Sequence, residues 1–339
     1  MENIGNIVFI AQNQMKAEFL RILKGFGFSE LKAEICAELF TVNSLEGVYT
    51  HGVNRFPGFV KNIKEGYIVP ESEPVMVHRT GSLEQWDGMS GPGPLNALFA
   101  TDRAMEMAQE NGIGMVALAN TNHWMRGGTY GWKAALEGFV FIGWTNTTAN
   151  MPAWGAKDFR QGNNPLVIAV PYGDEAIVLD FAMTQFSYGK MESYHREGKI
   201  LPFPGGFDSK GMLTSDPGDI IETQRALPIG YWKGAGLSLL LDIMATVLSG
   251  GLSTHEISKD KVEHSVSQVF IAISLKSLKN FPAIDNSIHQ IIEDLQCSEP
   301  ETVTAEIRYP GENVVKIRNK NLKNGIPVNR AIWEQILAL

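Results

Sequence analysis

One short segment, residues 47–57, brings a hydroxyl, an imidazole and a guanidinium group close together along the chain. His51 can give and take a proton near neutral pH, and the planar fork of Arg55 matches a carboxylate. Thr50 adds a hydroxyl beside the imidazole, and the flanking glycines and Pro57 favour a loop. The segment is typical of a site that protonates a carbonyl oxygen while holding an adjacent carboxylate. A surface histidine followed by a helix-capping arginine would give the same pattern.

A second polar segment, residues 120–131, follows an apolar run and precedes a helical pattern. It contains His123, Arg126 and three glycines. Backbone N–H groups at the start of a helix favour phosphate, and glycines allow a ligand to approach closely. We interpret the segment as a ligand-binding turn. The alternative interpretation is that its asparagines form turns while Trp124 and Trp132 fill the core.

Isolated polar residues elsewhere allow two interpretations each. Asp180 follows a strand-like run and is either a helix N-cap or an acid that orients an imidazole. Lys233 precedes a helical pattern and is either a contact for phosphate or carboxylate or a solvated lysine. Asn163 lies in a polar cluster that either holds a sugar hydroxyl or forms a turn. The remaining histidines show no metal-ligand spacing, so we expect no metal site.

The elements that would position these residues alternate between helices and strands, which predicts an α/β fold. A Rossmann fingerprint is absent, because Gly234-Ala-Gly236 lacks the third glycine and follows no apolar strand. We expect helices over residues 15–23, 31–40, 56–66, 95–111, 129–136, 235–248, 286–295 and 330–337. We expect strands over residues 75–78, 83–86, 115–118, 139–144, 166–170, 176–179, 269–275 and 314–317.

The composition is that of a globular protein with a sizeable core, since 44% of its 339 residues are hydrophobic and 19% are charged. A net charge of −8 without a basic run argues against nucleic acid or an anionic membrane as a partner. Two cysteines without metal spacing fit a reducing compartment. The first residues lack a basic lead, and the apolar run 237–248 is short of a membrane span. We therefore expect a cytoplasmic protein.

Five motifs together carry a resemblance to a known family. They are Gly47-Val-Tyr-Thr-His-Gly-Val-Asn-Arg-Phe, Asn122-His-Trp-Met-Arg-Gly-Gly, Pro152-Ala-Trp-Gly-Ala-Lys, Gly162-Asn-Asn-Pro-Leu and Tyr231-Trp-Lys-Gly-Ala-Gly. In this order, and over nearly the whole chain, they resemble the malate/L-lactate dehydrogenase family that lacks a Rossmann domain. The resemblance implies a mixed β-sheet flanked by helices and a homodimer. It implies NADH as cofactor, with NADPH possible, and a small keto acid as substrate.

The resemblance also implies roles for individual residues. The family's proton donor falls on His51, its relay hydroxyl on Thr50, where a serine is usual, and its substrate-carboxylate arginine on Arg55. Asp180 is expected at the catalytic centre as well as at the cofactor. The other cofactor contacts are expected at His123, Trp124, Met125, Arg126, Gly127, Asn163, Ala176, Ile177, Val178, Leu179, Phe181, Ala182, Trp232, Lys233, Gly311, Glu312 and Asn313.

We expect a helical lobe of residues 1–80 and 285–339, which contributes the catalytic loop and dimer contacts, and an α/β NAD-binding lobe of residues 81–284. The hypothesis for the mechanism is hydride delivery to the C2 ketone of a keto acid while His51 protonates the developing alkoxide. The resemblance implies 2,3-diketo-L-gulonate as the substrate, and malate, lactate, ureidoglycolate or a cyclic imino acid are the alternatives within the family. A non-catalytic binding protein for a sugar acid or nucleotide is the rival class, and a metal-dependent hydrolase is disfavoured by the histidine spacing.

Overall fold

A mixed seven-stranded sheet forms the centre of the computed structural model, which describes residues 6–260, 262–302 and 304–339. Neighbouring strands are antiparallel except for one parallel pair, β3 with β4. The strands, in their order across the sheet, are β2 (Val75–Thr80), β3 (Leu83–Asp87), β4 (Ile113–Thr121), β12 (Val266–Ser274), β5 (Phe139–Thr145), β8 (Leu166–Tyr172) and β9 (Glu175–Phe181). The predicted mixed α/β fold is confirmed.

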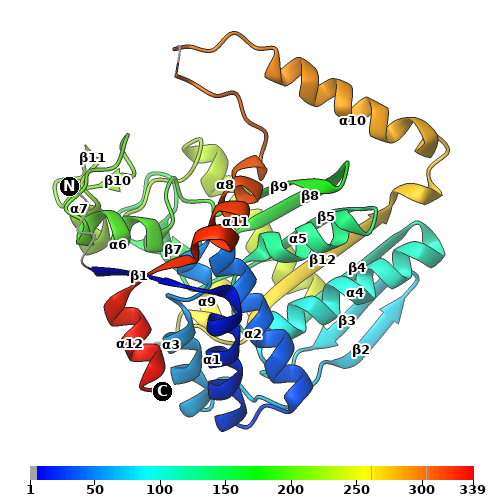
Figure 1. Ribbon diagram of the computed structural model, residues 1–339, viewed down its shortest axis with the longest axis horizontal. Coiled ribbons are helices and arrows are strands. Elements are labelled where there is room, and N and C mark those ends of the chain that lie inside the picture. The colour runs from blue at the N-terminus through cyan, green and yellow to red at the C-terminus, as the bar shows by residue number, and fades with distance from the viewer. Residues whose placement is uncertain (1–5, 261, 303) are drawn as a thin grey trace.

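Helices cover both faces of this sheet (Figure 1). Helices α4 (Gly93–Asn111) and α5 (Gly127–Leu136) pack on one face, and α8 (Trp232–Ser249) packs on the other. The buried residues of α4 include four alanines, which let the helix come close to the sheet. At Gly114 in β4 the approach is so close that a Cβ would lie 2.1 Å from the Ala104 carbonyl oxygen. By length and composition, α8 is the one helix in the described part of the chain that could cross a membrane.

A helical lobe lies beside the sheet and carries the segment that holds Thr50 and His51. Its members are β1 (Ile7–Ile10), α1 (Gln12–Gly25), α2 (Glu30–Leu45), α3 (Phe56–Lys64), β13 (Ile326–Asn329) and α12 (Arg330–Leu337). Strand β1 pairs with β13 in antiparallel fashion, which joins the two ends of the described chain. The Phe56 ring stacks on Phe19 at 4.1 Å and meets the edge of Phe40 at 5.1 Å. Aromatic packing therefore anchors the residues that follow the Thr50-His51 loop.

A small subdomain is inserted between β9 and α8, and no sequence pattern predicted it. It contains α6 (Tyr188–Arg196), α7 (Pro217–Thr223), β10 (Gly206–Phe207) and β11 (Leu213–Thr214). Its own core is formed by Phe186, Met191, Leu201, Ile220 and Ala226. Shorter elements complete the fold: β6 (Met151–Pro152), β7 (Phe159–Gln161), α9 (Thr254–Ile257) and the 3₁₀ turns η2 (Tyr49–His51) and η3 (Leu275–Ser277).

The expected strand over residues 314–317 is wrong, because these residues lie in α11 (Glu312–Asn324). The β-branched residues that favoured a strand pack as helical residues instead, with Val314 and Val315 against the core beneath α4 and α5. One turn later, the Arg318 guanidinium lies 5.0 Å from the centre of the Trp132 ring. Tertiary contacts thus override local propensity here. Helix α10 (Phe281–Gln296) is longer than expected, and with residues 297–302 it forms an arm that stands away from the body in Figure 1.

Candidate active site

The loop that carries Thr50 and His51 is held by the end of α2. The Ser44 hydroxyl accepts a hydrogen bond from the Val53 backbone at 2.8 Å, and the Asn43 amide donates to the His51 carbonyl at 3.0 Å. A Cβ at Gly52 would lie 2.3 Å from the Ser44 hydroxyl oxygen, so a larger residue would push the loop away from α2. The loop is therefore tightly fixed, as the position of a reacting group requires.

Two imidazoles meet at the end of this loop. The rings of His51 and His123 are stacked, with centroids 5.6 Å apart and planes at 15°. The Thr50 hydroxyl lies 3.3 Å from Nδ1 of His51. The Met125 backbone N–H donates to Nδ1 of His123 at 2.9 Å, which leaves Nε2 of that ring to carry the hydrogen. The structure thus brings together three residues that the sequence placed in two separate segments.

Both imidazoles are neutral at pH 7. Burial by surrounding protein, together with the nearby His123, Arg55 and Arg126, lowers the pKa of His51 to about 3. The same burial, with Arg55, lowers the pKa of His123 to about 3. Each ring is nevertheless partly accessible, so both lie in a recess rather than in the core. A negatively charged ligand in this recess would favour the protonated form of either ring.

A cavity of 220 Å³ opens beside His123. Polar groups from α3 and from the segment before β12 line it, namely Arg55, Lys61, Asn62 and Glu263. Among the residues that the structure describes, nothing forms a hydrogen bond or ion pair with the Arg55 guanidinium, which leaves its donors available to a ligand. The cavity therefore combines a free cation with hydrogen-bonding groups, next to the imidazole pair.

Glu263 belongs to this site, although the sequence analysis did not select it. Its carboxylate accepts hydrogen bonds from the Thr148 backbone at 3.0 Å and from the Thr148 hydroxyl at 3.1 Å. It also raises the pKa of His51, against the larger lowering effects. No motif surrounds this residue in the sequence, so no local signal could have selected it.

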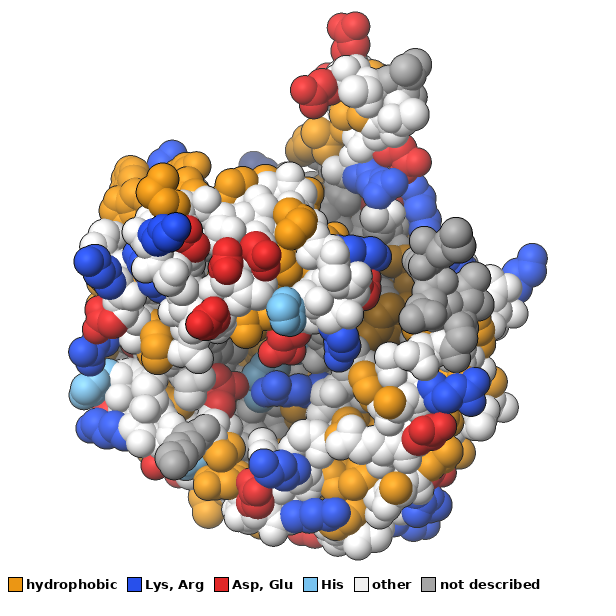
Figure 2. All heavy atoms as spheres, turned by 90° about the vertical axis from the view of Figure 1, so that its left-hand side faces the viewer, with side chains coloured by type: hydrophobic (Ala, Val, Ile, Leu, Met, Phe, Trp, Pro, Cys, Tyr) orange, Lys and Arg blue, Asp and Glu red, His pale blue; other side chains and the backbone are white. Residues whose placement is uncertain are grey.

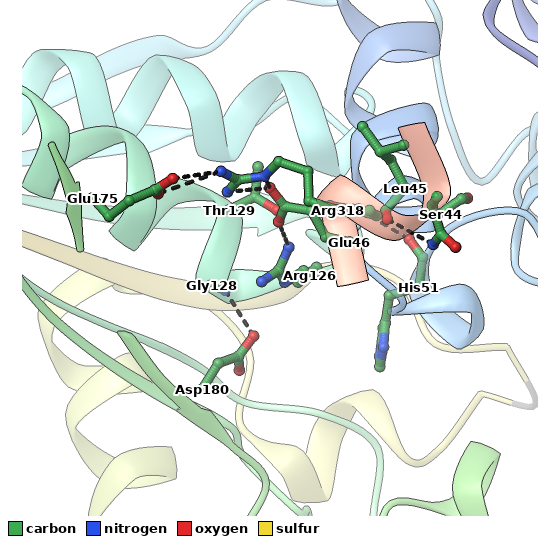
Figure 3. A network of polar contacts seen from close by, with 12 residues as sticks. Ser44, Leu45, Glu46, His51, Arg126, Gly128, Thr129, Glu175, Asp180 and Arg318 are labelled. Carbon is green, nitrogen blue, oxygen red and sulfur yellow. Dashed lines mark hydrogen bonds and ion pairs between the residues drawn. The ribbon is translucent and has the colours of Figure 1, made fainter. Parts of the chain in front are cut away.

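The expected cofactor segments meet around the start of α5. Asp180 belongs to β9, and its carboxylate accepts a hydrogen bond from the Gly128 backbone N–H at 2.7 Å (Figure 3). It therefore caps α5 from the neighbouring strand. In Figure 3, Arg126 lies between Asp180 and His51, and among the described residues no hydrogen bond joins Asp180 to either imidazole.

Close packing explains the glycines in these segments. A Cβ at Gly127 would lie 2.7 Å from both the Trp124 ring and Val167. At Gly311, where φ is +95°, a Cβ would lie 3.2 Å from the Val178 backbone nitrogen. The Val178 N–H donates to the Pro310 carbonyl at 3.1 Å, which holds the start of α11 against β9. Glu312 forms an ion pair with Lys316 at 2.9 Å, and Asn313 is exposed. Leu179 in β9 is exposed. The other cofactor contacts expected on β9 or just after it are Ala176, Ile177, Phe181 and Ala182.

Arg126 and Trp124 have structural partners. Arg126 is buried in an ion pair with Glu46, which also binds Arg318 at 2.7 Å, and Arg318 reaches Glu175 at 3.0 Å (Figure 3). Trp124 is buried against Tyr130 and Phe270. Met125 is buried in the core of the helical lobe. The side chains of these three residues are therefore buried and support the site.

Trp232 and Lys233 lie farther along the fold, in the exposed first turn of α8. A hydrogen bond holds the residues before this turn beside the residues that follow β9: the Ile229 N–H donates to the Met183 carbonyl at 2.9 Å. Asn163 lies nearby, where its backbone carbonyl accepts from the Met183 N–H at 2.7 Å and its side chain accepts from Thr147 at 3.1 Å. These residues lie beside the end of β9 that also carries Asp180.

The mixed sheet and the recessed imidazoles beside a free arginine define an α/β enzyme without a Rossmann domain. Residues 10–337 match the family described as malate/L-lactate dehydrogenase, so the chain belongs to this family and is an oxidoreductase.

Individual relatives and solved structures agree with this assignment. A 2,3-diketo-L-gulonate reductase from Escherichia coli (strain K12 / DH10B) is 44% identical over 327 residues, which cover 96% of this chain and 98% of the relative. A malate dehydrogenase from Entamoeba histolytica has the same fold, with a TM-score of 0.92, 24% identity, and coverage of 97% of this chain and 96% of the other. A sulfolactate dehydrogenase from Methanocaldococcus jannaschii gives a TM-score of 0.87 at 26% identity and covers 98% of both chains.

Proposed function

We propose that the protein reduces 2,3-diketo-L-gulonate to 3-keto-L-gulonate with NADH. Hydride would reach C2 of the substrate, and a proton from His51 would convert the developing alkoxide into the hydroxyl group. The similarity to curated 2,3-diketo-L-gulonate reductases supports the substrate. The observation that carries the proposal is the free Arg55 guanidinium beside the stacked His51 and His123 rings.

Each residue of the site has a proposed task. Arg55 binds the substrate carboxylate with its fork of N–H donors. His51 gives its proton to the C2 oxygen. The Thr50 hydroxyl, 3.3 Å from Nδ1, is the group through which the ring regains a proton. His123 can donate from Nε2 to a substrate oxygen, since its Nδ1 is already occupied by the Met125 N–H. These groups orient the ketone and stabilise the charge that develops on its oxygen.

The lining of the cavity favours a substrate with several hydroxyl groups. Lys61, Asn62 and Glu263 together offer donors and acceptors beyond Arg55. A sugar acid has hydroxyl groups to satisfy both kinds of partner. The second carboxylate of malate would instead face the Glu263 carboxylate, which would weaken its binding. Reduction of another keto acid or of a cyclic imino acid is the alternative within the family.

The residues around β9 fit a nicotinamide cofactor, which supplies the hydride when bound. β9 lies at the edge of the main sheet and exposes Leu179, an apolar surface against which a ring can pack. Lys233 in the first turn of α8 adds an exposed cation, which suits a pyrophosphate. We propose that Asp180 and the segments 123–127, 176–182, 232–233 and 311–313 hold this cofactor, with NADH as the expected form.

We also propose a cytoplasmic homodimer whose interface includes the outer face of α8. Leu239, Leu240, Ile243 and Val247 expose between 47% and 70% of their surface, at helical spacing along one side. Such a continuous apolar face fits an interface with a second copy of the chain. On the face drawn in Figure 2, by contrast, positive and negative side chains are interspersed, which gives nucleic acid no continuous basic patch to bind. The division into lobes of residues 1–80 with 285–339 and of residues 81–284 stays a prediction.

The decisive experiment follows the loss of NADH absorbance with purified protein and a panel of keto acids. Rapid oxidation with 2,3-diketo-L-gulonate, and slow oxidation with pyruvate and oxaloacetate, is the expected result. Faster turnover with another keto or imino acid would move the substrate within the family. NADH binding without turnover on any of them would contradict the proposed reaction and favour a binding protein.

A further inference from the structure

The first turn of α6 lies directly on the loop that carries Thr50. The Tyr188 hydroxyl donates to the Asn150 carbonyl at 2.8 Å, and Ser187 caps the helix by accepting from the Lys190 N–H. These contacts fix the start of the helix. Gly189 follows, and a Cβ at this position would lie 2.9 Å from the Thr50 methyl carbon and 3.1 Å from its Cβ. The helix can approach Thr50 this closely because residue 189 has no side chain.

This contact determines how the Thr50 side chain is turned. Its methyl group faces Gly189, whereas its hydroxyl oxygen would be 3.7 Å from a Cβ there and lies 3.3 Å from Nδ1 of His51. A β-branched side chain has few accessible χ1 rotamers, so a fixed place for the methyl also fixes the hydroxyl. The extra methyl of threonine, compared with serine, therefore fills the space that Gly189 leaves.

We propose that Gly189 is a positioning residue for the reaction, because it provides the space that keeps the Thr50 hydroxyl directed at His51. The inference rests on the proposed role of His51 as proton donor. It assigns the inserted subdomain a part in catalysis, although Gly189 itself has no side chain that could touch a substrate. It also implies that threonine at position 50 requires glycine at position 189, although the two positions are far apart in the sequence.

The first test is Gly189→Ala. Alanine favours a helix more than glycine does, so the variant should unfold at the same or a higher temperature. The added methyl should nevertheless displace Thr50 and lower kcat by roughly ten- to a hundredfold, since small misplacements at a reacting group are costly. The dissociation constant for NADH should not change. Gly25→Ala in α1 is the matched control, because nothing lies within 4 Å of a Cβ there.

The second test asks whether the loss depends on the Thr50 methyl. Thr50→Ser removes the atom that lies 2.9 Å from the added Cβ and leaves the 3.1 Å contact. In this background Gly189→Ala should therefore cost much less, by roughly threefold at most, which is the non-additivity expected of residues in contact. Equal losses in both backgrounds, or full activity of Gly189→Ala alone, would overturn the proposal.

A third measurement keeps this inference separate from the proposed reaction. In ligand-free protein labelled with ¹⁵N-histidine, Gly189→Ala should shift the ring signals and the pKa of His51, and Thr50→Ser should cancel most of this effect. A His51→Asn variant identifies the signals. Unchanged His51 signals in Gly189→Ala would overturn the inference even in an active enzyme. A shifted His51 in a protein that reduces no keto acid would contradict only the proposed reaction.

Discussion

The rings of His51 and His123 face each other in parallel, 5.6 Å apart, although they belong to different elements of the fold. A charge on one ring disfavours a charge on the other, because His123 lowers the pKa of His51. Both rings are neutral near pH 7 in the free protein, and their titrations are coupled, so a bound anion favours protonation of one ring rather than of both. A site that takes up one proton when an anion binds suits a reaction that consumes one.

Replacing His51 with Ala should lower kcat by roughly a hundred- to ten-thousandfold, the usual contribution of one general acid. Binding of NADH should change little, because His51 is not among the residues proposed to hold this cofactor. Steady-state kinetics and fluorescence titration with NADH measure the two effects. His255→Ala, at an exposed position on α9, is the control. Full turnover of His51→Ala would remove this residue from the mechanism.

Binding of a carboxylate should cause the protein to take up a proton. In the free protein the pKa of His51 is about 3, so the ring is neutral at pH 7. A negative charge beside Arg55 favours the imidazolium form and raises this pKa, so the complex binds more protons than the free protein. The uptake should grow as the pH falls from about 7 towards about 5.

Calorimetry of oxalate binding in two buffers with different ionisation enthalpies measures this uptake. His51→Asn should reduce it strongly. If the heat of binding is independent of the buffer at every pH, the anion and the imidazole do not interact.

Changing Arg55 to Lys should raise the KM for the keto acid by at least about tenfold while kcat falls less. The lysine keeps the positive charge but cannot bind both carboxylate oxygens with a planar fork. Initial rates over a range of substrate concentrations separate the two constants. The KM for NADH should stay the same, and an unchanged KM for the keto acid would show that Arg55 does not bind the carboxylate.

Replacing Glu46 with Ala should destabilise the protein by about 3–5 kcal/mol, because it leaves the buried Arg126 without its partner. The free energy of unfolding from urea titration measures this loss. Glu306→Ala removes an exposed partner of Arg308 and should cause no measurable loss. Equal stability of the Glu46 variant and the wild-type protein would mean that the Glu46 ion pairs contribute no net stability.

Placing a charge on the outer face of α8, as in Val247→Asp, should shift a dimer towards monomers. Val247 exposes 70% of its surface within an apolar row, and burying a carboxylate there without a partner is costly. Light scattering after size-exclusion chromatography gives the mass. Leu31→Asp, on the exposed side of α2, should leave the mass unchanged. A dimer that persists in Val247→Asp would place the interface elsewhere.

The sequence allowed prediction of the parts of the fold that have strong periodicity, and motif residues indicated much of the site. The loop at Thr50 and His51 was visible because reactive side chains and glycines occur close together. Glu263 was not, since a single acid shows its role only when Thr148 and the imidazoles lie beside it in space. The strand predicted at Val314 and Val315 was wrong for a related reason. Their β-branched shape favours a strand locally, whereas their packing beneath α4 and α5 requires a helix.

The pairing of β1 with β13 has a consequence for how the active protein is made. The core that anchors Phe56, just after the loop that carries Thr50 and His51, also contains Ile326, Val328 and Ile336. During synthesis, α1, α2 and the loop leave the ribosome long before these residues exist. The loop therefore acquires its final support late, so that incomplete chains should lack activity even where the central sheet has already formed.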